Sequence, residues 1–546
     1  MQNIFSKLGL LLFMIAISFN ANAQKDTTKL NLNQVEVVKA FEANLATAER
    51  VAISPVMPTK PAFEPIYTYD ITIIPFDIKY PDPIIKPLAM NADEPYIVKN
   101  GYIQAAYGLL KNPAIMAGYH KAKKDTYNAG IHLDYTALDN TKNTPLQKYS
   151  DLNAGVYGSY LIKENMAVDA QMKVGTQRRY FYHTDLGVDT LFAEADSKRN
   201  ITNTLIEAAV RNVERTSLGL DYRVGVSLGN TSMTNTQISE SSSKIMASVS
   251  KYFGDKAVLD LKGSYEYTGL EADTSHSLNV VNFKPTLKVD FDKLSVVVGV
   301  DYLYGSRNQS SLFPEIAITY ALMAQKIQVF ARVGQDHFIN SITNTYSDNP
   351  YINGQLDSLT MSVTKSMHGG VKGNFSFLRY EVSGGYKMVA RQQFLLNNRT
   401  DLRYFDRLVD DMNVLFISGN VEFVLTDQII IGGRLTQNFY DLATLSNAWH
   451  LPNLVAAPYF KTQLLNNKLN ITGELYFNDN VDYLDKAGNI TKSNVLFDFN
   501  LSASYDITPD FKVFINGINL FDNKFERWYG YPSVGFNAQV GARLIF

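Results

Sequence analysis

The chain ends in FNAQVGARLIF, residues 536–546, and this stretch indicates the fold class. Apolar side chains alternate with polar ones along it. Phe536, Val540, Leu544 and Phe546 belong to the apolar face, whereas asparagine, glutamine and arginine fall on the other. Because successive side chains of a β-strand point to opposite faces, such alternation predicts a strand with one apolar and one polar side.

The same period of two recurs upstream. It is clear in residues 257–267, 469–477 and 495–505, each with apolar residues at odd positions and mostly polar residues at even ones. No run beyond the first 23 residues approaches the 18 apolar residues of a membrane-spanning helix. If the protein lies in a membrane, it must therefore be a closed barrel, because only closure pairs every backbone group in lipid. Soluble β-sandwiches alternate as well, so periodicity by itself leaves both classes open.

The connections between the predicted strands favour the membrane barrel. Polar turns such as 254–256, 292–293 and 508–510 are short, whereas 183–201, 338–356 and 394–407 are long. Short connections at one end and long ones at the other are the layout of bacterial outer-membrane barrels. We expect an all-β, antiparallel up-and-down barrel over residues 101–546 with about 22 strands. The count falls to 18 or 20 if the marginal segments 101–121 and 450–465 are split wrongly.

Aromatic clusters stand near the ends of strands that lead into long loops. They are Tyr180-Phe181-Tyr182, Tyr265 with Tyr267, Tyr302 with Tyr304, Phe439-Tyr440 and Tyr476-Phe477. An aromatic belt at one membrane interface would place them there. The alternative is ordinary sheet aromatics, which strands favour in any case.

The first 100 residues divide into two expected segments. Residues 1–23 have the pattern of an export signal, with Lys7, an apolar stretch over 8–19 and Ala-Asn-Ala at 21–23, so the mature chain would begin at Gln24. Nine of the 18 prolines lie between Pro55 and Pro95. Since proline fixes φ and removes an amide donor, we expect residues 24–100 to form an extended, proline-rich segment.

Two features near the C-terminus resemble known signals. A terminal phenylalanine on an alternating strand resembles the signal by which the barrel assembly machinery engages its substrates. The resemblance implies this role for Phe536, Val540, Leu544 and Phe546. Residues 516–525 (NGINLFDNKF), followed by Tyr-Pro at 531–532, resemble the closing motif of TonB-dependent receptors. The resemblance implies a barrel of 22 strands and localisation in the outer membrane of a Gram-negative cell.

The chain departs from that family at its N-terminal end. Family members carry a plug domain of roughly 130 to 150 residues within the barrel, whereas residues 24–100 lack its glycine-rich motifs. Residues 33–38 (NQVEVV) resemble a TonB box only weakly. Beyond lipid and the assembly machinery, the expected partners of residues 24–100 are TonB or a periplasmic protein or lipoprotein.

The sequence gives little support for an enzyme. No two of the seven histidines have the i, i+4 spacing of a zinc site. Ser241 and Lys244 match a Ser-x-x-Lys motif, but they lie in a predicted strand and the accompanying Lys-Thr-Gly is missing. Lys and Arg number 51 against 53 Asp and Glu, so charge does not favour nucleic acid. We expect no enzyme, no metal and no cofactor. With no cysteine, the chain has neither disulfides nor a lipidation site.

Three functions remain open from the sequence. The first is a transport or channel barrel for an unidentified solute, whose lumen must then be filled by residues 55–95, by a partner or by inward-folded loops. The second is a structural or assembly platform on which residues 24–100 bind a periplasmic or lipoprotein partner. The third is a soluble exported β-protein.

Overall fold

The computed structural model describes residues 99–546 apart from 164, 185–195, 235–237, 307–308, 324–325 and 355–358. The expected signal peptide and the proline-rich segment lie outside the described residues. The helix α2 (Ile342–Asp348) is short. Within the described ranges, no helix has the length and apolar character needed to cross a bilayer.

Strands make up most of the described chain, and they follow one another with few interruptions. They are β1 (Gly101–Gly108), β2 (Asn112–Lys123), β3 (Tyr127–Asp139), β4 (Lys148–Lys163), β5 (Met166–Tyr180), β6 (Lys198–Asn212), β7 (Leu220–Thr234), β8 (Ile238–Phe253), β9 (Ala257–Glu271), β10 (Ser275–Asp290), β11 (Leu294–Gly305), β12 (Gln309–Met323), β13 (Ile327–Asn340), β14 (Thr360–Asn374), β15 (Leu378–Asn397), β16 (Phe405–Thr426), β17 (Ile429–Leu442), β18 (Leu454–Leu464), β19 (Leu469–Asn478), β20 (Asp482–Leu484), β21 (Ile490–Lys492), β22 (Leu496–Thr508), β23 (Phe511–Ile518) and β24 (Asn537–Ile545).

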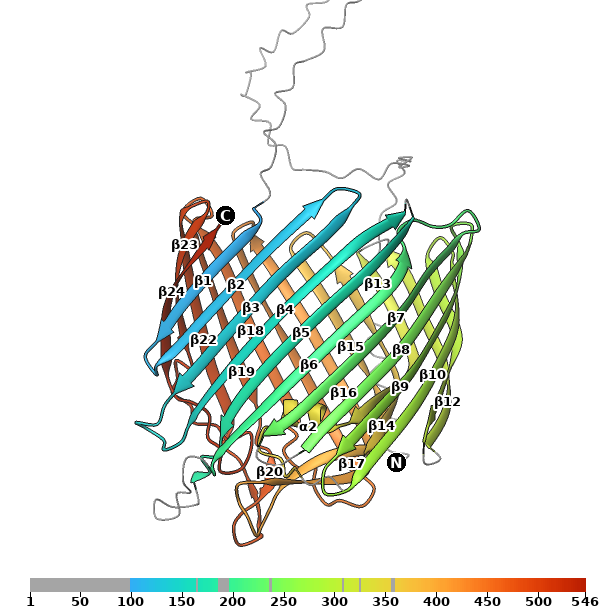
Figure 1. Cartoon of the computed structure of the whole chain (residues 1–546). Coiled ribbons are helices and arrows are strands. Elements are labelled where there is room, and N and C mark those ends of the chain that lie inside the picture. The colour runs from blue at the N-terminus through green and yellow to red at the C-terminus, as the bar shows by residue number, and fades with distance from the viewer. Residues whose placement is uncertain are drawn as a thin grey trace, which may run out of the picture. The chain divides into compact units, whose positions relative to one another are not determined.

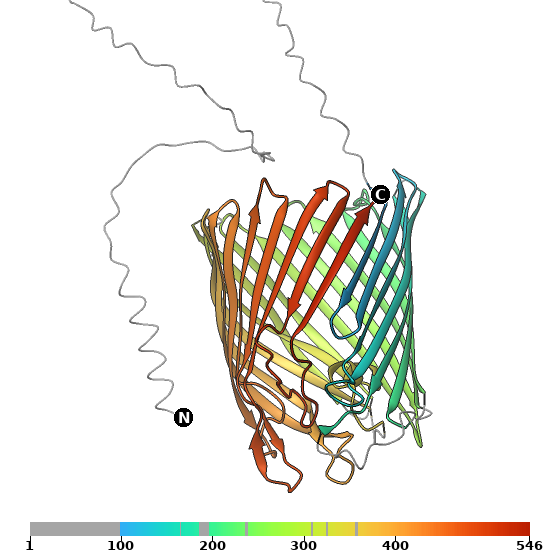
Figure 2. The ribbon, with the colours of Figure 1, turned by 90° about the vertical axis from the view of Figure 1, so that its left-hand side faces the viewer.

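All of these except β20 and β21 form one sheet of 22 strands. Neighbours along the chain pair antiparallel, and β24 pairs with β1 through a register that runs from Tyr102↔Ile545 to Gly108↔Gln539. The sheet is therefore closed, as Figure 1 shows where β1 and β2 lie beside β23 and β24. Figure 2 views this seam from another side. The predicted fold class and strand number are confirmed.

The two ends of the barrel differ in the length of their connections. On the end that holds Gly101 and Phe546, the longest connection is 213–219, and most are tight turns. On the opposite end, residues 181–197, 341–359, 479–495 and 519–536 separate consecutive barrel strands. The long loops therefore gather at the end away from the chain terminus in Figure 1. We call this the loop end, and the other the turn end.

The alternation of side chains follows the closed ring. In β11, Val298, Val300, Tyr302 and Tyr304 are exposed on one face, whereas Asp301 is buried on the other. Cross-strand partners lie on the same face of a sheet, so the registers of the paired strands carry this parity around the whole ring. The apolar face points outward and the mainly polar face lines the lumen, which is the pattern of a barrel surrounded by lipid.

Candidate functional site: the barrel lumen

Part of one long hairpin leaves the barrel wall. Pairing between β12 and β13 begins at Met323↔Ile327 and stops at Ile316↔Val333. Pairing between β13 and β14 nevertheless continues to Asn340↔Thr360. The far part of this hairpin therefore has no partner on its β12 side, and it turns into the lumen with α2. Figures 1 and 2 show this segment within the outline of the barrel. We call residues 334–354 and 359–363 the inner hairpin.

The inner hairpin is hydrogen-bonded to a distant part of the wall. The Glu240 carboxylate on β8 accepts hydrogen bonds from the Ile342 amide at 2.7 Å and from the Thr343 hydroxyl at 2.5 Å. Nε2 of His337 lies 3.3 Å from the Glu266 carboxylate on β9. These strands are separated from β13 by β10–β12, so the inner hairpin reaches across the lumen instead of following its wall.

Loops close over the inner hairpin at the loop end. The rings of Tyr351 and Tyr531 stack with centroids 3.6 Å apart, and Tyr182 packs edge-on against Tyr531. Burial raises the pKa of both Tyr351 and Tyr531 well above the usual value. The buried Arg199 donates to the Ile352 carbonyl at 2.6 Å. Residues from β6–β11, the inner hairpin and three further loop-end segments thus share one apolar core, which we call the outer core. It comprises Phe181, Ile201, Met233, Ile238, Leu270, Leu278, Val280, Leu303, Ile342, Tyr346, Tyr351, Ile352, Leu359, Met361, Val363, Leu395, Phe405, Trp528 and Tyr531.

One predicted aromatic cluster belongs to this core instead of to an interface belt. Tyr180 and Phe181 are buried, and Phe181 packs edge-on against Tyr404 at 5.1 Å. The interpretation of this cluster as lipid-facing was wrong, because the apolar side chains of the inner hairpin provide a second surface for aromatics to bury. Tyr265, Tyr302 and Tyr304 are exposed on the outward face, as a belt requires.

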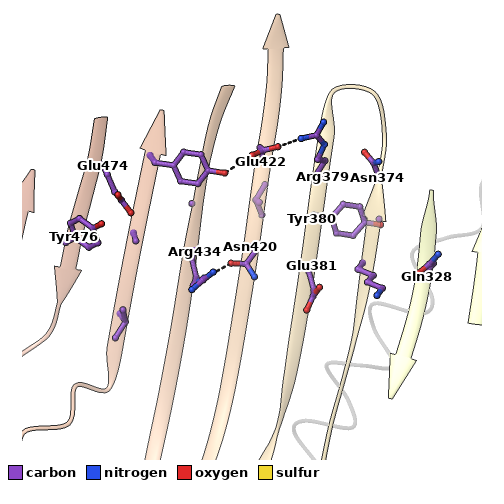
Figure 3. Close-up of a pocket in the computed structure, with 17 residues that line it drawn as sticks. Gln328, Asn374, Arg379, Tyr380, Glu381, Asn420, Glu422, Arg434, Glu474 and Tyr476 are labelled. Atoms are coloured by element: carbon purple, nitrogen blue, oxygen red, sulfur yellow. Dashed lines mark hydrogen bonds and ion pairs between the residues drawn. The ribbon is translucent and has the colours of Figure 1, made fainter. Parts of the chain in front are cut away.

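A hollow of about 810 Å³ lies on the lumen wall over β13–β19, toward the turn end. The registers of these strands place two rows of inward-facing residues across it. The first row, from β13 to β18, is Gln328, Lys372, Glu381, Asn420, Arg434 and Ala457. The second, from β14 to β19, is Asn374, Arg379, Glu422, Gly432, Tyr459 and Glu474. Figure 3 shows Arg379, Glu422, Asn420, Arg434 and Glu474 on neighbouring strands of this wall. Most of the lining residues are polar, and they carry both signs of charge.

Three polar contacts order the hollow. The guanidinium of Arg379 lies 2.6 Å from the Glu422 carboxylate, which also accepts the Tyr459 hydroxyl hydrogen bond at 2.7 Å. Arg434 donates to the Asn420 side chain at 3.0 Å. Tyr459 reaches Glu422 across β17 because Gly432 lies between them in the register and has no side chain. A Cβ at Gly432 would lie 2.7 Å from the Tyr459 ring.

Comparisons with known proteins identify the fold. No family model and no curated protein matches the sequence. A variant of the FrpB iron transporter from Neisseria meningitidis matches the structure with a TM-score of 0.65 and 9% identity over 82% of each chain. The siderophore receptor PirA from Acinetobacter baumannii matches at 0.64 and 8%, over 82% of this chain and 80% of that one. The ferripyoverdine receptor of the outer membrane of Pseudomonas aeruginosa, bound to ferripyoverdine, matches at 0.62 and 10%, over 82% and 72%.

The chain shares its barrel fold with these iron-transporter and siderophore-receptor structures. In this barrel, the motif at residues 516–525 has a structural task. Asn519 follows β23 with a positive φ of 50°, and its side chain amide donates to the carbonyls of Asn523 and Val534 at 2.8 and 2.9 Å. The Asp522 carboxylate accepts from the Phe536 amide at 2.8 Å. The motif thus ties both ends of the loop 519–536 together.

The four residues predicted to form the assembly signal lie along the last strand of the barrel or at its ends. Phe536, Val540, Leu544 and Phe546 are all exposed, and Val540 and Leu544 lie on the outward face. Phe546 also closes the ring, since its carbonyl accepts from the amides of Asn100 and Gly101 at 2.8 and 2.7 Å. The backbones of Val540, Leu544 and Phe546 form part of the seam with β1, whatever role the side chains have in assembly.

Sequence reasoning missed the position of the inner hairpin in the barrel, although it included inward-folded loops among the candidates for filling the lumen. One signal was present. Leu270, Leu278, Val280 and Leu303 are apolar at positions whose parity points into the lumen, where polar residues are the rule. Apolar side chains on the inward face indicate that something packs against them, but they do not identify which loop does so.

Proposed function

We propose that this chain is an outer-membrane barrel of the transport type, which passes a solute through its lumen. The observation that carries the proposal is the closed ring of 22 strands with an apolar outer face and a polar lumen. The structural likeness to an iron transporter and to siderophore receptors supports the same class. The solute is not identified by these observations, because recognition depends on individual lumen and loop side chains.

The inner hairpin and the outer core limit entry from the loop end. A solute that crosses the barrel must pass or displace them, so transport requires their movement or an energy input. TonB, acting through residues 24–100, is one candidate for that input. A periplasmic or lipoprotein partner bound by the same segment would instead support the platform alternative, which nothing in the described residues favours.

Fractionation and flux test the proposal together. The full-length protein should appear in the outer-membrane fraction and should migrate differently on gels before and after heating. Reconstituted into liposomes, it should increase the uptake of small polar solutes above that of protein-free vesicles. Release on osmotic shock in a detergent-independent form would overturn the membrane assignment. Correct fractionation without any flux, in the wild type and in a variant with a loosened inner hairpin, would refute transport.

We also propose that the side chains of Phe536, Val540, Leu544 and Phe546 act as the barrel assembly signal. Substitution of Phe546 by Ala should lower the amount of heat-modifiable protein in the outer membrane, whereas protein refolded in detergent should keep its unfolding temperature within a few degrees. The Phe536→Ala variant is measured in the same way, because Phe536 belongs to the predicted signal but lies just before β24. Equal losses in cells and in detergent would indicate a purely structural role.

A further inference from the structure

We infer that the lumen wall formed by β13–β18 is a binding surface for oxyanions, meaning solutes that carry carboxylate or phosphate groups. The inference rests on the proposed transport function and specifies its solute class. In the half of this wall nearer the turn end, the inward-facing charged residues, by register, are mainly cations. They are Arg332, Lys372, Arg379, Lys387, Arg434 and Lys461, against the acids Glu381 and Glu422. Nearer the loop end, the acids Asp336, Asp406 and Asp410 share the same parity.

These cations lack carboxylate partners, with one exception. In the described part of the chain, Arg379 is the only one of the six within ion-pair distance of an acidic side chain. The ammonium groups of Lys372, Lys387 and Lys461 instead lie over the rings of Phe330, Phe416 and Tyr459, at 5.6, 4.7 and 5.1 Å from the ring centres. A cation–π contact holds a lysine in place without neutralising its charge.

The rest of the lumen is built differently. On the wall from β4 to β12, most inward-facing cations are matched by nearby acids. Ion pairs there join Arg179 to Asp151, Arg211 and Arg223 to Asp169, Lys244 to Glu266, Lys284 to Asp301 and Lys288 to Asp290, with distances between 2.5 and 2.9 Å. The balance of charge over the whole chain therefore conceals an asymmetry inside the barrel.

These cations surround or line the hollow on the same wall. Lys372, Arg434 and the ion-paired Arg379 line it directly, together with the acids Glu381, Glu422 and Glu474, and Arg434 is exposed to the lumen. A guanidinium presents several N–H donors in a plane, which matches the two oxygens of a carboxylate or phosphate. Lysine and arginine side chains that line a pore favour anions over cations. Beside its three carboxylates, the hollow has two cations without an acidic partner, Lys372 and Arg434, and with the amides of Gln328 and Asn420 they form a set of donors that suits a polar oxyanion.

Calorimetric titration of the full-length, detergent-purified protein tests the inference without requiring transport. Citrate serves as the carboxylate probe, pyrophosphate as the phosphate probe and sucrose as a neutral one. We expect at least one anion to bind more tightly than sucrose, with an affinity that falls as NaCl is raised. The triple variant Lys372→Gln, Lys387→Gln and Arg434→Gln should bind that anion about tenfold more weakly or worse, the loss expected for at least one charge-assisted contact.

A matched triple variant separates the site from the overall charge. Arg211→Gln, Lys244→Gln and Lys288→Gln remove the same number of cations from the paired wall, and this protein should keep anion affinity within about twofold, since distant exposed charges are screened. Binding of neither anion by the wild type, or an equal loss in both triple variants, would overturn the inference. Anion binding without liposome flux would leave the site standing and reject transport. Flux without anion binding would support transport and reject the oxyanion site.

Discussion

The contact between Tyr459 and Glu422 depends on a missing side chain at Gly432. Glycine is needed there for space, because the Tyr459 ring lies where a Cβ would be. We predict that Gly432→Ala displaces the ring and breaks the hydrogen bond to Glu422, at a cost of about 1 kcal/mol. Detergent-phase unfolding of the variant measures this cost.

A double-mutant cycle and a control glycine make this prediction specific. Tyr459→Phe should cost much less in the Gly432→Ala background than in the wild type, because the bond it removes is already lost. Gly419→Ala on β16 is the control, since a Cβ there meets no other atom within 4 Å. Additive costs for Gly432→Ala and Tyr459→Phe would show that Gly432 does not position the tyrosine.

His450 makes the loop end sensitive to acid. Burial lowers the pKa of His450 from 6.5 to about 4, and its Nδ1 lies 3.0 Å from the Arg527 carbonyl. A histidine that is neutral when folded binds a proton more readily when unfolded. Stability should therefore fall as the pH drops from about 6.5 toward 4, by at most about 3 kcal/mol, and should be unaffected by this group above pH 7.

Tryptophan fluorescence can follow this transition. Both tryptophans, Trp449 and Trp528, lie in the loops near His450, and the Trp528 ring is 4.9 Å from it. We expect a change in emission between pH 6 and pH 4 that is much reduced in His450→Leu. His276, a partly exposed residue near the start of β10, provides the control variant His276→Leu. An unchanged pH profile in His450→Leu would assign the transition to other groups.

Under the proposed transport function, the inner hairpin is the element that controls passage through the barrel. Glu240 holds its tip, and both carboxylate oxygens are used in that contact. Glu240→Ala would leave the buried Ile342 amide without its partner, at a cost of about 1 to 3 kcal/mol. We predict that this variant raises the open fraction of single channels in planar bilayers by roughly tenfold.

A neighbour on the same strand provides the comparison for Glu240. Ser242 lies two residues along β8, faces the same side, and makes none of the hairpin contacts described above. Ser242→Ala should conduct as the wild type does. If both variants conduct alike, the hairpin either does not limit the pore or is held by its other contacts, such as that of His337 with Glu266. The double variant Glu240→Ala with His337→Ala distinguishes these two outcomes.

For the whole molecule, the proposed role of residues 55–95 in filling the lumen stays a prediction, because they lie outside the described residues. Deleting them should raise single-channel conductance if they occupy part of the lumen. The deletion is compared with a second variant in which residues 55–95 are replaced by glycine and serine, which keeps the length of the chain. Unchanged conductance in both would count against a lumen-filling role and would leave the inner hairpin as the barrier.

Much of the architecture was predictable, and the reason is that it is encoded locally. Alternation in 257–267 and 536–546 reports which face of a strand meets lipid, and short turns such as 254–256 fix antiparallel neighbours. The strand number follows from these local features once the sheet must close. The candidate site was not predictable, since the hollow is assembled by β13–β19 and its rows depend on register across all of them.

The amino-acid sequence by itself determined that this chain forms an antiparallel barrel, because period-two patterning and turn positions act over a few residues. Only the tertiary structure decided that residues 334–354 and 359–363 leave the wall and bind β8, since the contact between Glu240 and Ile342 spans 102 residues. It also decided which lumen cations find carboxylates and which do not. Pairing across a barrel depends on distances that closure of the ring creates, and a linear pattern does not contain them.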